Sequence, residues 1–284
     1  MGDFKGAHFA ADVARSVRAP FETTTKSLSF DRAAHFYDET RGFPPGVADL
    51  VADAALEILG PGKQVLEVGI GTGRIAKPLL ARGFRITGVD LSRKMMRRLL
   101  ETLPPDQPRP ALVIADAAQL PFVSGWFDAA LSVHVFHLIA GWQAALAEMR
   151  RILKPEGVFL TGYEWRPPDT PGKLILDKWR EIVGARGMGD CQPGAQDFED
   201  VKAALLGAGA AMEEWAVGEW TTTRSLARHL ETIEHRTWSS TWLVPDDFFP
   251  QCLAELRSWA IGEFGGLETE FTTPHKFIWQ RFRW

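Results

Sequence analysis

The stretch VLEVGIGTGRIAKPLL, residues 65–80, decides the fold of this chain. A short apolar run leads into three glycines at alternate positions, Gly69, Gly71 and Gly73, and an apolar pattern of helical spacing follows. Such a strand, turn and helix are typical of α/β proteins that bind a ligand where a strand ends and a helix begins. The turn therefore predicts a ligand site, and the residues around it indicate which ligand it binds.

Strands and helices alternate along the chain as far as residue 165. Apolar runs predict strands at 63–69, 84–90, 111–116, 127–136 and 158–165, and helical spacing predicts helices at 73–83, 92–103 and 142–157. Ser92 is the expected N-cap of the second of these helices. Several strands are continuously apolar, which indicates a mostly parallel sheet covered by helices on both faces. We expect a doubly wound α/β fold with its ligand outside the carboxyl ends of the strands.

The pattern divides the chain into three predicted segments. Residues 1–29 are mixed and polar and predict a weakly anchored arm, 30–164 form the ligand-binding core, and 165–284 complete the sheet with helical insertions at about 170–190 and 225–265. Nine of the eleven tryptophans lie from Trp165 onward. A single tryptophan is more often core than ligand contact, but the group favours a mostly apolar pocket under a helical lid.

The composition restricts the class of protein. The 284 residues are 45% apolar and carry 32 Lys and Arg against 36 Asp and Glu, a net charge of −4, with no long basic run. We therefore expect no nucleic-acid partner. Cys191 and Cys252 make no disulfide framework. A signal peptide and an apolar run long enough to span a membrane are both absent from the sequence, so the expected location is cytoplasmic.

The glycine spacing argues against a phosphate-binding turn. A dinucleotide-binding turn needs a third glycine where this chain has Arg74, and the Gly-Lys-Ser/Thr of a P-loop is absent. Three carboxylates, Glu67, Asp90 and Asp116, are expected at the carboxyl ends of neighbouring strands. An acidic crevice suits S-adenosylmethionine, which has cationic groups and hydroxyls but no phosphate. Asp90 would accept both ribose hydroxyls, Asp116 the adenine amino group, and Ala117 would donate its N–H to the ring.

Four motifs in order resemble one known family. VLEVGIGTGR, ITGVDLSRKMM, IADAAQLPFVSGWFDAALSVHVFHLI and MRRILKPEGVFLTG are similar to the successive motifs of class I S-adenosylmethionine-dependent methyltransferases, in the ubiquinone/menaquinone-biosynthesis-like (methyltransferase type 11) group. The resemblance covers roughly residues 30–164 and implies a Rossmann-like, seven-stranded sheet. It implies a cofactor site made of Tyr37, Arg41, Glu67, Gly69, Gly71, Thr72, Gly73, Asp90, Leu91, Met95, Asp116 and Ala117. Tyr37 and Arg41 belong to an N-terminal segment that this family often places over the cofactor.

Three residues are candidates for catalysis. Methyl transfer needs a base only when the acceptor must lose a proton, and His134 and His137, beyond the fourth strand, are placed to take it. Glu164, expected just after the fifth strand, is the third candidate. The alternatives are a turn cap for His137, and a solvated carboxylate or a partner of Arg166 for Glu164. No metal is expected, because two histidines alone do not make a ligand set.

The predicted function is transfer of a methyl group from S-adenosylmethionine to oxygen or carbon of a small, apolar or aromatic acceptor. A non-catalytic protein of the same fold, binding the cofactor or a partner, is the first alternative, and an NAD-dependent oxidoreductase is the second. A protein or RNA acceptor ranks below a small molecule because the insertions are not basic. The identity of the acceptor and the oligomeric state stay open.

Overall fold

A computed structural model describes residues 26–188 and 192–284. It contains a seven-stranded sheet in the order β3-β2-β1-β4-β5-β7-β6, in which β7 is antiparallel to both of its neighbours and the other pairs are parallel. The strands are β1 (Gln64–Val68), β2 (Arg85–Asp90), β3 (Ala111–Ile114), β4 (Phe127–Val133), β5 (Leu153–Trp165), β6 (Ala211–Ser225) and β7 (Glu270–Arg283). The predicted fold class is confirmed.

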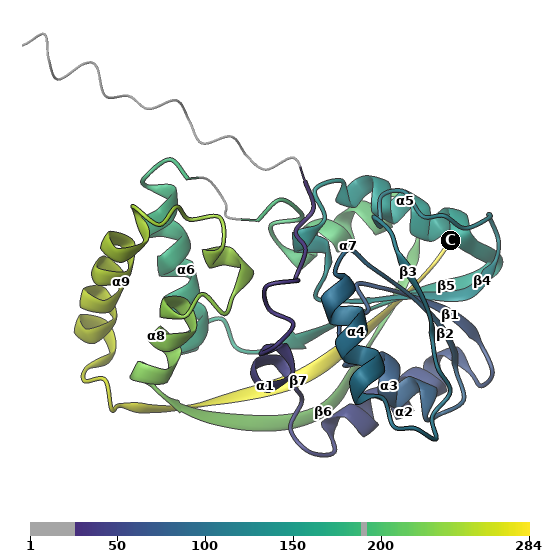
Figure 1. Cartoon of the computed structure of the whole chain (residues 1–284), viewed down its shortest axis with the longest axis horizontal. Coiled ribbons are helices and arrows are strands. Elements are labelled where there is room, and N and C mark those ends of the chain that lie inside the picture. Colours follow the sequence, from purple (N-terminus) through teal and green to yellow (C-terminus); the bar gives the residue numbers. More distant parts are fainter. Residues whose placement is uncertain (1–25, 189–191) are drawn as a thin grey trace, which may run out of the picture.

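Helices cover both faces of this sheet (Figure 1). One face carries α2 (Val47–Leu59), α3 (Ala76–Leu80) and α4 (Arg93–Thr102), and the other carries α5 (Trp142–Ile152) and α7 (Phe198–Gly207). β1 shows why helices are needed on both faces. Val65 is buried in the apolar core under α2, α3 and α4, and Leu66 is buried in the core under α5 and α7. A strand that is apolar on both faces has to lie between two layers of helices.

Several elements differ from their predicted bounds; α3 is shorter than the predicted 73–83, and β4 ends at Val133 instead of residue 136. The helix expected at 142–157 ends at Ile152, and β5 begins at Leu153, which pairs with Phe127 of β4. Pro155 disfavours a helical backbone at the preceding residue, so the sheet takes this segment instead. β3 ends at Ile114, which leaves Asp116 in the loop that follows it. The predicted cap of α4 is confirmed, since the Ser92 hydroxyl accepts from the backbone N–H of Met95.

The predicted helical insertions form a separate cap beside the sheet (Figure 1). The cap consists of α6 (Pro171–Gly184), α8 (Leu226–Glu234) and α9 (Phe249–Phe264), and has its own core around Trp179, Leu230 and Leu256. The short elements α1 (Tyr37–Arg41), η2 (Phe136–Leu138) and η3 (Ser239–Thr241) complete the fold. These three helices lie within the ranges 170–190 and 225–265; that they cover the substrate stays a prediction.

A two-stranded ribbon joins the cap to the sheet. β7 pairs with β5 only as far as Trp165 and Lys276, whereas β6 and β7 stay paired to Ser225 and Glu270. The ribbon beyond the sheet runs under the space between cap and core (Figure 1). Its side chains therefore contribute to any site in that space.

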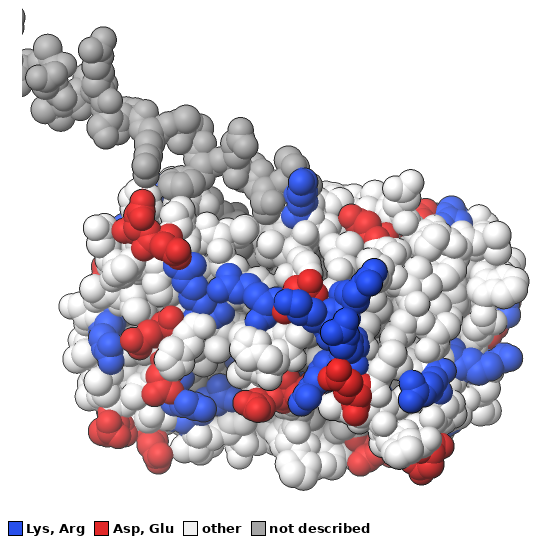
Figure 2. Space-filling view, viewed as in Figure 1, with Lys and Arg blue, Asp and Glu red and all other residues white. Residues whose placement is uncertain are grey.

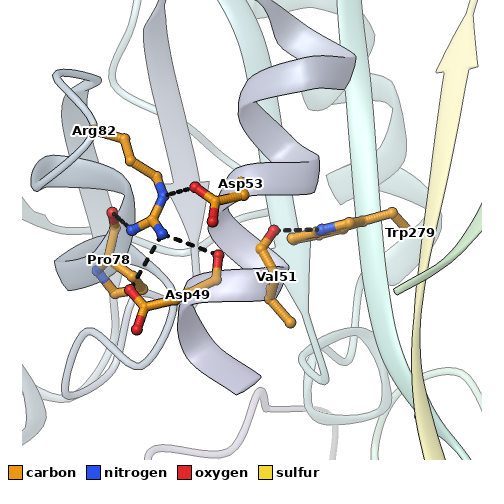
Figure 3. Close-up of polar contacts among 6 residues, drawn as sticks. All are labelled: Asp49, Val51, Asp53, Pro78, Arg82 and Trp279. Carbon is orange, nitrogen blue, oxygen red and sulfur yellow. Dashed lines mark hydrogen bonds and ion pairs between the residues drawn. The ribbon is translucent and has the colours of Figure 1, made fainter. Parts of the chain in front are cut away.

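A tryptophan and an arginine tie α2 to the rest of the core (Figure 3). Trp279 of β7 is fully buried and donates from its indole nitrogen to the Val51 carbonyl at 3.0 Å. Arg82, after α3, bonds the carboxylates of Asp49 and Asp53 and the carbonyls of Asp49 and Pro78. The sheet and the end of α3 thus hold opposite sides of one helix.

Several terminal and cysteine predictions fall partly outside the described residues. Residues 1–25 of the predicted arm and Cys191 lie outside them. Cys252 is a buried free cysteine of the cap core. Within residues 26–188 and 192–284, none of the helices combines the length and apolar character required to cross a membrane.

Candidate active site

The glycine turn lies at the carboxyl end of β1, beside the point where the strand order reverses between β1 and β4. Gly69, Gly71 and Gly73 have φ angles of +72°, +55° and +79°, a conformation that side chains rarely adopt. A Cβ on Gly69 would lie 2.6 Å from Val135. The turn is thus closely packed, and its backbone approaches the crevice without side chains in between.

Asp90, at the end of β2, holds this turn in place. Its carboxylate accepts from the N–H of Gly71 at 2.9 Å and from the N–H of Ser92 at 2.7 Å. Burial raises the pKa of Asp90, against the opposing effect of these backbone bonds. Each oxygen has a second lone pair, so the carboxylate can still accept two hydroxyl groups.

Glu67 is a buried carboxylate without a full set of partners. It is 3% exposed, and its Oε2 has no hydrogen-bond donor among the described residues. Burial raises the pKa of Glu67 well above its ordinary value, and the nearby Asp90 adds to this effect while Arg74 opposes it. A buried polar atom left unpaired is costly, so this position favours a ligand that brings a donor.

An inner cleft lies where the strands β1, β2 and β4 end. Nine predicted site residues line it, and they come from the N-terminal segment, the turn, and the ends of β2, β3 and β4. They are Tyr37, Gly69, Gly71, Asp90, Leu91, Met95, Asp116, Ala117 and His134. Glu67, Thr72 and Gly73 do not line the cleft. Thr72 donates to Asp38, and a Cβ on Gly73 would clash with Leu99, so both support the turn from behind.

The N-terminal segment closes the cleft more tightly than its sequence predicted. Ser27, Leu28 and Phe30 line the cleft. The Leu28 N–H donates to the Leu138 carbonyl at 2.9 Å. Asp31 accepts from the Ser92 hydroxyl at 2.6 Å and so extends the cap of α4. Residues 26–43 are therefore a cover segment, fixed through two aspartates to the turn and to α4.

A larger cavity of about 1130 Å³ opens beside the inner cleft, between the core and the cap. This cap cavity shares Phe30, Tyr37, His134 and Val135 with the inner cleft. Five predicted site residues line it, which are Tyr37, Arg41, His134, His137 and Glu164. The two cavities therefore meet at His134, and the other two residues predicted for catalysis, His137 and Glu164, line the cap cavity alone.

The backbone around His134 fixes its ring. His134 has φ of +53°, and its Nε2 accepts from the N–H of Glu164 at 3.2 Å. The ring forms part of the cavity wall, and burial, followed by the charge of Arg74, lowers its pKa to about 3. His134 is neutral at pH 7, and one of its nitrogens is already an acceptor. Strained backbone of this kind is typical of functional sites.

His137 is free to meet a ligand. Its ring lines the cap cavity and makes no hydrogen bond to any described residue, so the predicted turn-cap alternative is not seen. Burial, followed by the charges of Arg41 and Arg180, lowers its pKa to about 4. The ring is therefore a neutral imidazole with both nitrogens available at pH 7.

Glu164 differs from its prediction in place and partner. It lies within β5, and its ion pair is with Arg74 at 2.7 Å instead of Arg166. Arg74 also donates to the Arg41 carbonyl and lies 4.5 Å above the Phe43 ring. Burial alone would raise the pKa of Glu164, but Arg74 and His134 outweigh it and the pKa is lowered. Through its ion pair with Arg74, Glu164 links β5 to the glycine turn and to the cover segment.

The cap cavity combines apolar and charged walls. Trp220 and Trp238 line it, as the tryptophan count predicted, together with Lys, Arg, Asp and Glu side chains and five of the seven histidines of the chain. The indole of Trp179 is buried in the cap core instead, and Trp279 is buried in the sheet. The parts of the chain that the structure describes hold no group of three His, Cys, Asp or Glu able to bind a metal.

Acid is expected to destabilise the protein through its buried histidines. Burial lowers the pKa of His229 to about 4, so between pH 6.5 and 4 the unfolded chain binds a proton that the folded chain does not. Stability is thus complete above pH 6.5 and falls as the pH drops through this window. His229→Gln should reduce the slope of unfolding free energy against pH by up to about 1.4 kcal/mol per unit. Urea unfolding at pH 7, 6 and 5 measures it, with the exposed His35→Gln as control. Equal slopes for His229→Gln and wild type would contradict this assignment.

Comparison with known proteins gives the same class as this geometry. Residues 66–161 match the family described as methyltransferase domain. The chain is 28% identical over 195 residues to 2-methyl-6-phytyl-1,4-hydroquinone methyltransferase of Synechocystis, covering 67% of this chain and 52% of the relative. It is 33% identical over 192 residues to a malonyl-acyl-carrier-protein O-methyltransferase of Laribacter hongkongensis, covering 64% and 62%.

A solved structure shares the fold. It is an N-methyltransferase of Haemonchus contortus in complex with phosphomonomethylethanolamine and S-adenosylhomocysteine, 18% identical, with a TM-score of 0.50, covering 89% of this chain and 57% of the other. The α/β core thus carries the match to a methyltransferase domain over residues 66–161 and shares its fold with this solved methyltransferase. Within that class, its relatives confirm the resemblance to the quinone-biosynthesis group. The chain spans about half to two thirds of the length of the curated relatives that it matches.

Proposed function

We propose that the protein is an enzyme that transfers the methyl group of S-adenosylmethionine to oxygen or carbon of a small organic acceptor. The observation that carries the proposal is the convergence of the predicted cofactor residues on one cleft that opens into the cap cavity. An acidic cleft without a phosphate cradle suits a cationic nucleoside. The adjoining cavity has the size of a small-molecule site.

The residues present fit this cofactor. Asp90 has free lone pairs for the ribose hydroxyls, and one oxygen of Asp116 is held by the N–H of Ala118. That bond orients the carboxylate, whose other oxygen is available to an adenine amino group. When bound, S-adenosylmethionine supplies an electrophilic methyl group.

The protein itself contributes by positioning the reactants. Residues of the cover segment line both cavities, and residues of the cap line the larger one, so an acceptor is held beside the inner cleft. Arg74 and Glu164 keep the turn, β5 and the cover segment in fixed relation through a largely buried ion pair. Holding reactants in one geometry supplies much of the acceleration of a displacement reaction.

His137 is our proposed general base, with His134 as a positioning residue. The Nε2 of His134 is engaged with the N–H of Glu164, whereas the ring of His137 is open to the cavity. A pKa of about 4 keeps the ring in its neutral, proton-accepting form at pH 7, although it makes His137 a weaker base than an ordinary histidine. Since a protonated imidazole cannot accept a proton, kcat/KM should be constant above about pH 5 and fall as the pH drops through 4.

Cofactor binding, methyl transfer and the role of His137 are tested one after the other. Calorimetry should show micromolar binding of S-adenosylmethionine and S-adenosylhomocysteine and none of NAD; NAD binding alone would favour the oxidoreductase. Turnover is then followed with an acceptor library, and binding without turnover would favour the non-catalytic alternative. His137→Ala should lower kcat at least about a hundredfold and leave cofactor affinity unchanged. A wild-type rate for His137→Ala, with loss in His134→Ala, would move the role of base to His134.

An acceptor attached to a carrier protein is a second candidate. Figure 2 shows Lys and Arg gathered across the middle of one face, over α4. α4 exposes Arg93, Lys94, Arg97 and Arg98, and its Met95 lines the inner cleft. A carrier with an acidic surface would complement this face. The acceptor library should therefore contain free and carrier-bound forms of the same acid.

A further inference from the structure

Three arginines that line the cap cavity have no carboxylate oxygen of a described residue within 4.0 Å. Seven Lys and Arg side chains of the described residues line it, and four of them lie within 4.0 Å of a carboxylate oxygen; these four are Arg74, Lys173, Arg180 and Arg228. Arg41, Arg166 and Arg224 have no such partner among the residues that the structure describes. Arg41 instead lies 5.6 Å from the Trp238 ring and donates to the Thr237 carbonyl at 3.5 Å.

The guanidinium groups of Arg166 and Arg224 have no hydrogen-bond partner within the described chain. Arg166 follows β5 directly, and Arg224 lies near the end of β6, where its backbone is paired with Phe271. Both guanidinium groups act on the same two histidines, His229 and His275, whose pKa values they lower in addition to the effect of burial. Both arginines line the cap cavity, Arg166 where β5 ends and Arg224 near the end of the ribbon strand β6.

This arrangement is unfavourable unless an anion completes it. Like charges placed together in a partly buried site repel each other. Burial lowers the pKa of Arg166, the charge of Glu164 opposes this effect, and the charge of Arg224 adds to it. Glu164 is shared, because it already pairs with Arg74 at 2.7 Å. The protein as a whole carries a net charge of −4, so this positive wall is a local feature.

We propose that Arg166 and Arg224 form an oxyanion subsite, which binds a carboxylate or phosphate group of the methyl acceptor. The planar guanidinium group matches both oxyanions through paired N–H donors. The neutral His229 and the threonines of the ribbon complete a polar wall around the pair. The acceptor is then an organic anion instead of a neutral apolar molecule. The role in acceptor binding rests on the proposed function, whereas the anion subsite itself does not.

The first test uses simple anions as probes. Thermal unfolding of the full chain is measured against inorganic phosphate and against acetate, at constant ionic strength set with sodium chloride. Wild type should show a saturable rise in Tm with at least one of them. The double variant Arg166→Gln/Arg224→Gln should need about tenfold more anion or more for the same rise, the usual size for losing charged hydrogen-bond donors. A stronger response to phosphate indicates a phosphate ester, and a stronger response to acetate indicates a carboxylic acid.

Matched variants make this test specific. Arg228→Gln removes a cation that lines the same cavity but pairs with Glu231, and it should respond like wild type. Arg166→Lys/Arg224→Lys keeps the charge and the fold but loses the paired donors, and should lie between wild type and the Gln variant. The subsite is refuted if wild type responds to neither anion, or if the Gln double variant responds as wild type does.

The second test separates the subsite from the proposed function. Acceptor acids are compared with their own primary amides, and S-adenosylhomocysteine is titrated into each variant. Transfer to the acid alone, lost in the Gln double variant with cofactor affinity kept, supports both proposals. If the cofactor does not bind wild type while the anion response persists, the methyltransferase proposal fails and the subsite stands. Equal transfer to acid and amide refutes the role in acceptor binding.

Discussion

Asp90→Ala should weaken binding of S-adenosylhomocysteine by about 1–3 kcal/mol, roughly ten- to a hundredfold. The carboxylate would lose its bonds to the ribose, and the N–H groups of Gly71 and Ser92 would lose their acceptor. The turn would then be less well held at the point where the ligand approaches its backbone. Calorimetric titration of each purified variant measures the change.

Two further aspartate variants give this experiment its controls. Asp90→Asn keeps one acceptor oxygen and the shape, and should lie between Asp90→Ala and wild type. Asp128→Ala removes a carboxylate that also accepts a backbone N–H, that of Gln64, but at the amino ends of β1 and β4, away from the glycine turn. It should bind the ligand within about twofold of wild type. An unchanged affinity in Asp90→Ala would contradict the ribose role.

Trp279→Ala should lower the free energy of unfolding by about 3–5 kcal/mol. The indole is fully buried and lies against Gly162 of β5, where a Cβ would come within 2.6 Å of the ring. Its removal leaves a cavity in the core under α2 and leaves the Val51 carbonyl without its donor (Figure 3). Urea unfolding followed by circular dichroism gives the value.

The contribution of the ring and that of its hydrogen bond can be separated. Trp279→Phe keeps most of the packing and should lower the free energy of unfolding much less than Trp279→Ala does. The loss that Trp279→Phe still shows reports mainly the missing hydrogen bond to Val51. Trp165→Ala, at a side chain that is 38% exposed, should change stability by about 0.5 kcal/mol or less. A loss below about 1 kcal/mol in Trp279→Ala would show that the core under α2 closes over the gap.

Local sequence signals predicted the parts of the fold that depend on neighbours along the chain. The glycines from Gly69 to Gly73 need positive φ, Ser92 caps the helix that it precedes, and the apolar strands are buried on both faces. Each of these is set by a few consecutive residues, so a pattern reveals it. The ends of the elements were less certain, as the early start of β5 shows.

Contacts between distant segments could not be predicted in the same way. Arg74 and Glu164 are 90 residues apart, and the notable feature of Arg74 in the sequence was only that it replaced a glycine. Residues 1–29 were expected to form a weakly anchored arm, because the carbonyl of Leu138, which accepts from the Leu28 N–H, lies 110 residues further along the chain. The polar wall of the cap cavity was missed because tryptophans were counted without knowing which of them the cap core buries. No local pattern distinguishes Arg166 or Arg224 from an arginine that pairs with a carboxylate.

The separate core of the cap has a consequence for how such an enzyme diversifies. Trp179, Leu230 and Leu256 stabilise the cap through contacts that include none of the residues of the glycine turn. Substitutions on the cap and ribbon can therefore alter the choice of acceptor while the turn, Asp90 and the cofactor chemistry stay as they are. During evolution the α/β core can therefore be kept for its reaction while the cap changes to fit another substrate.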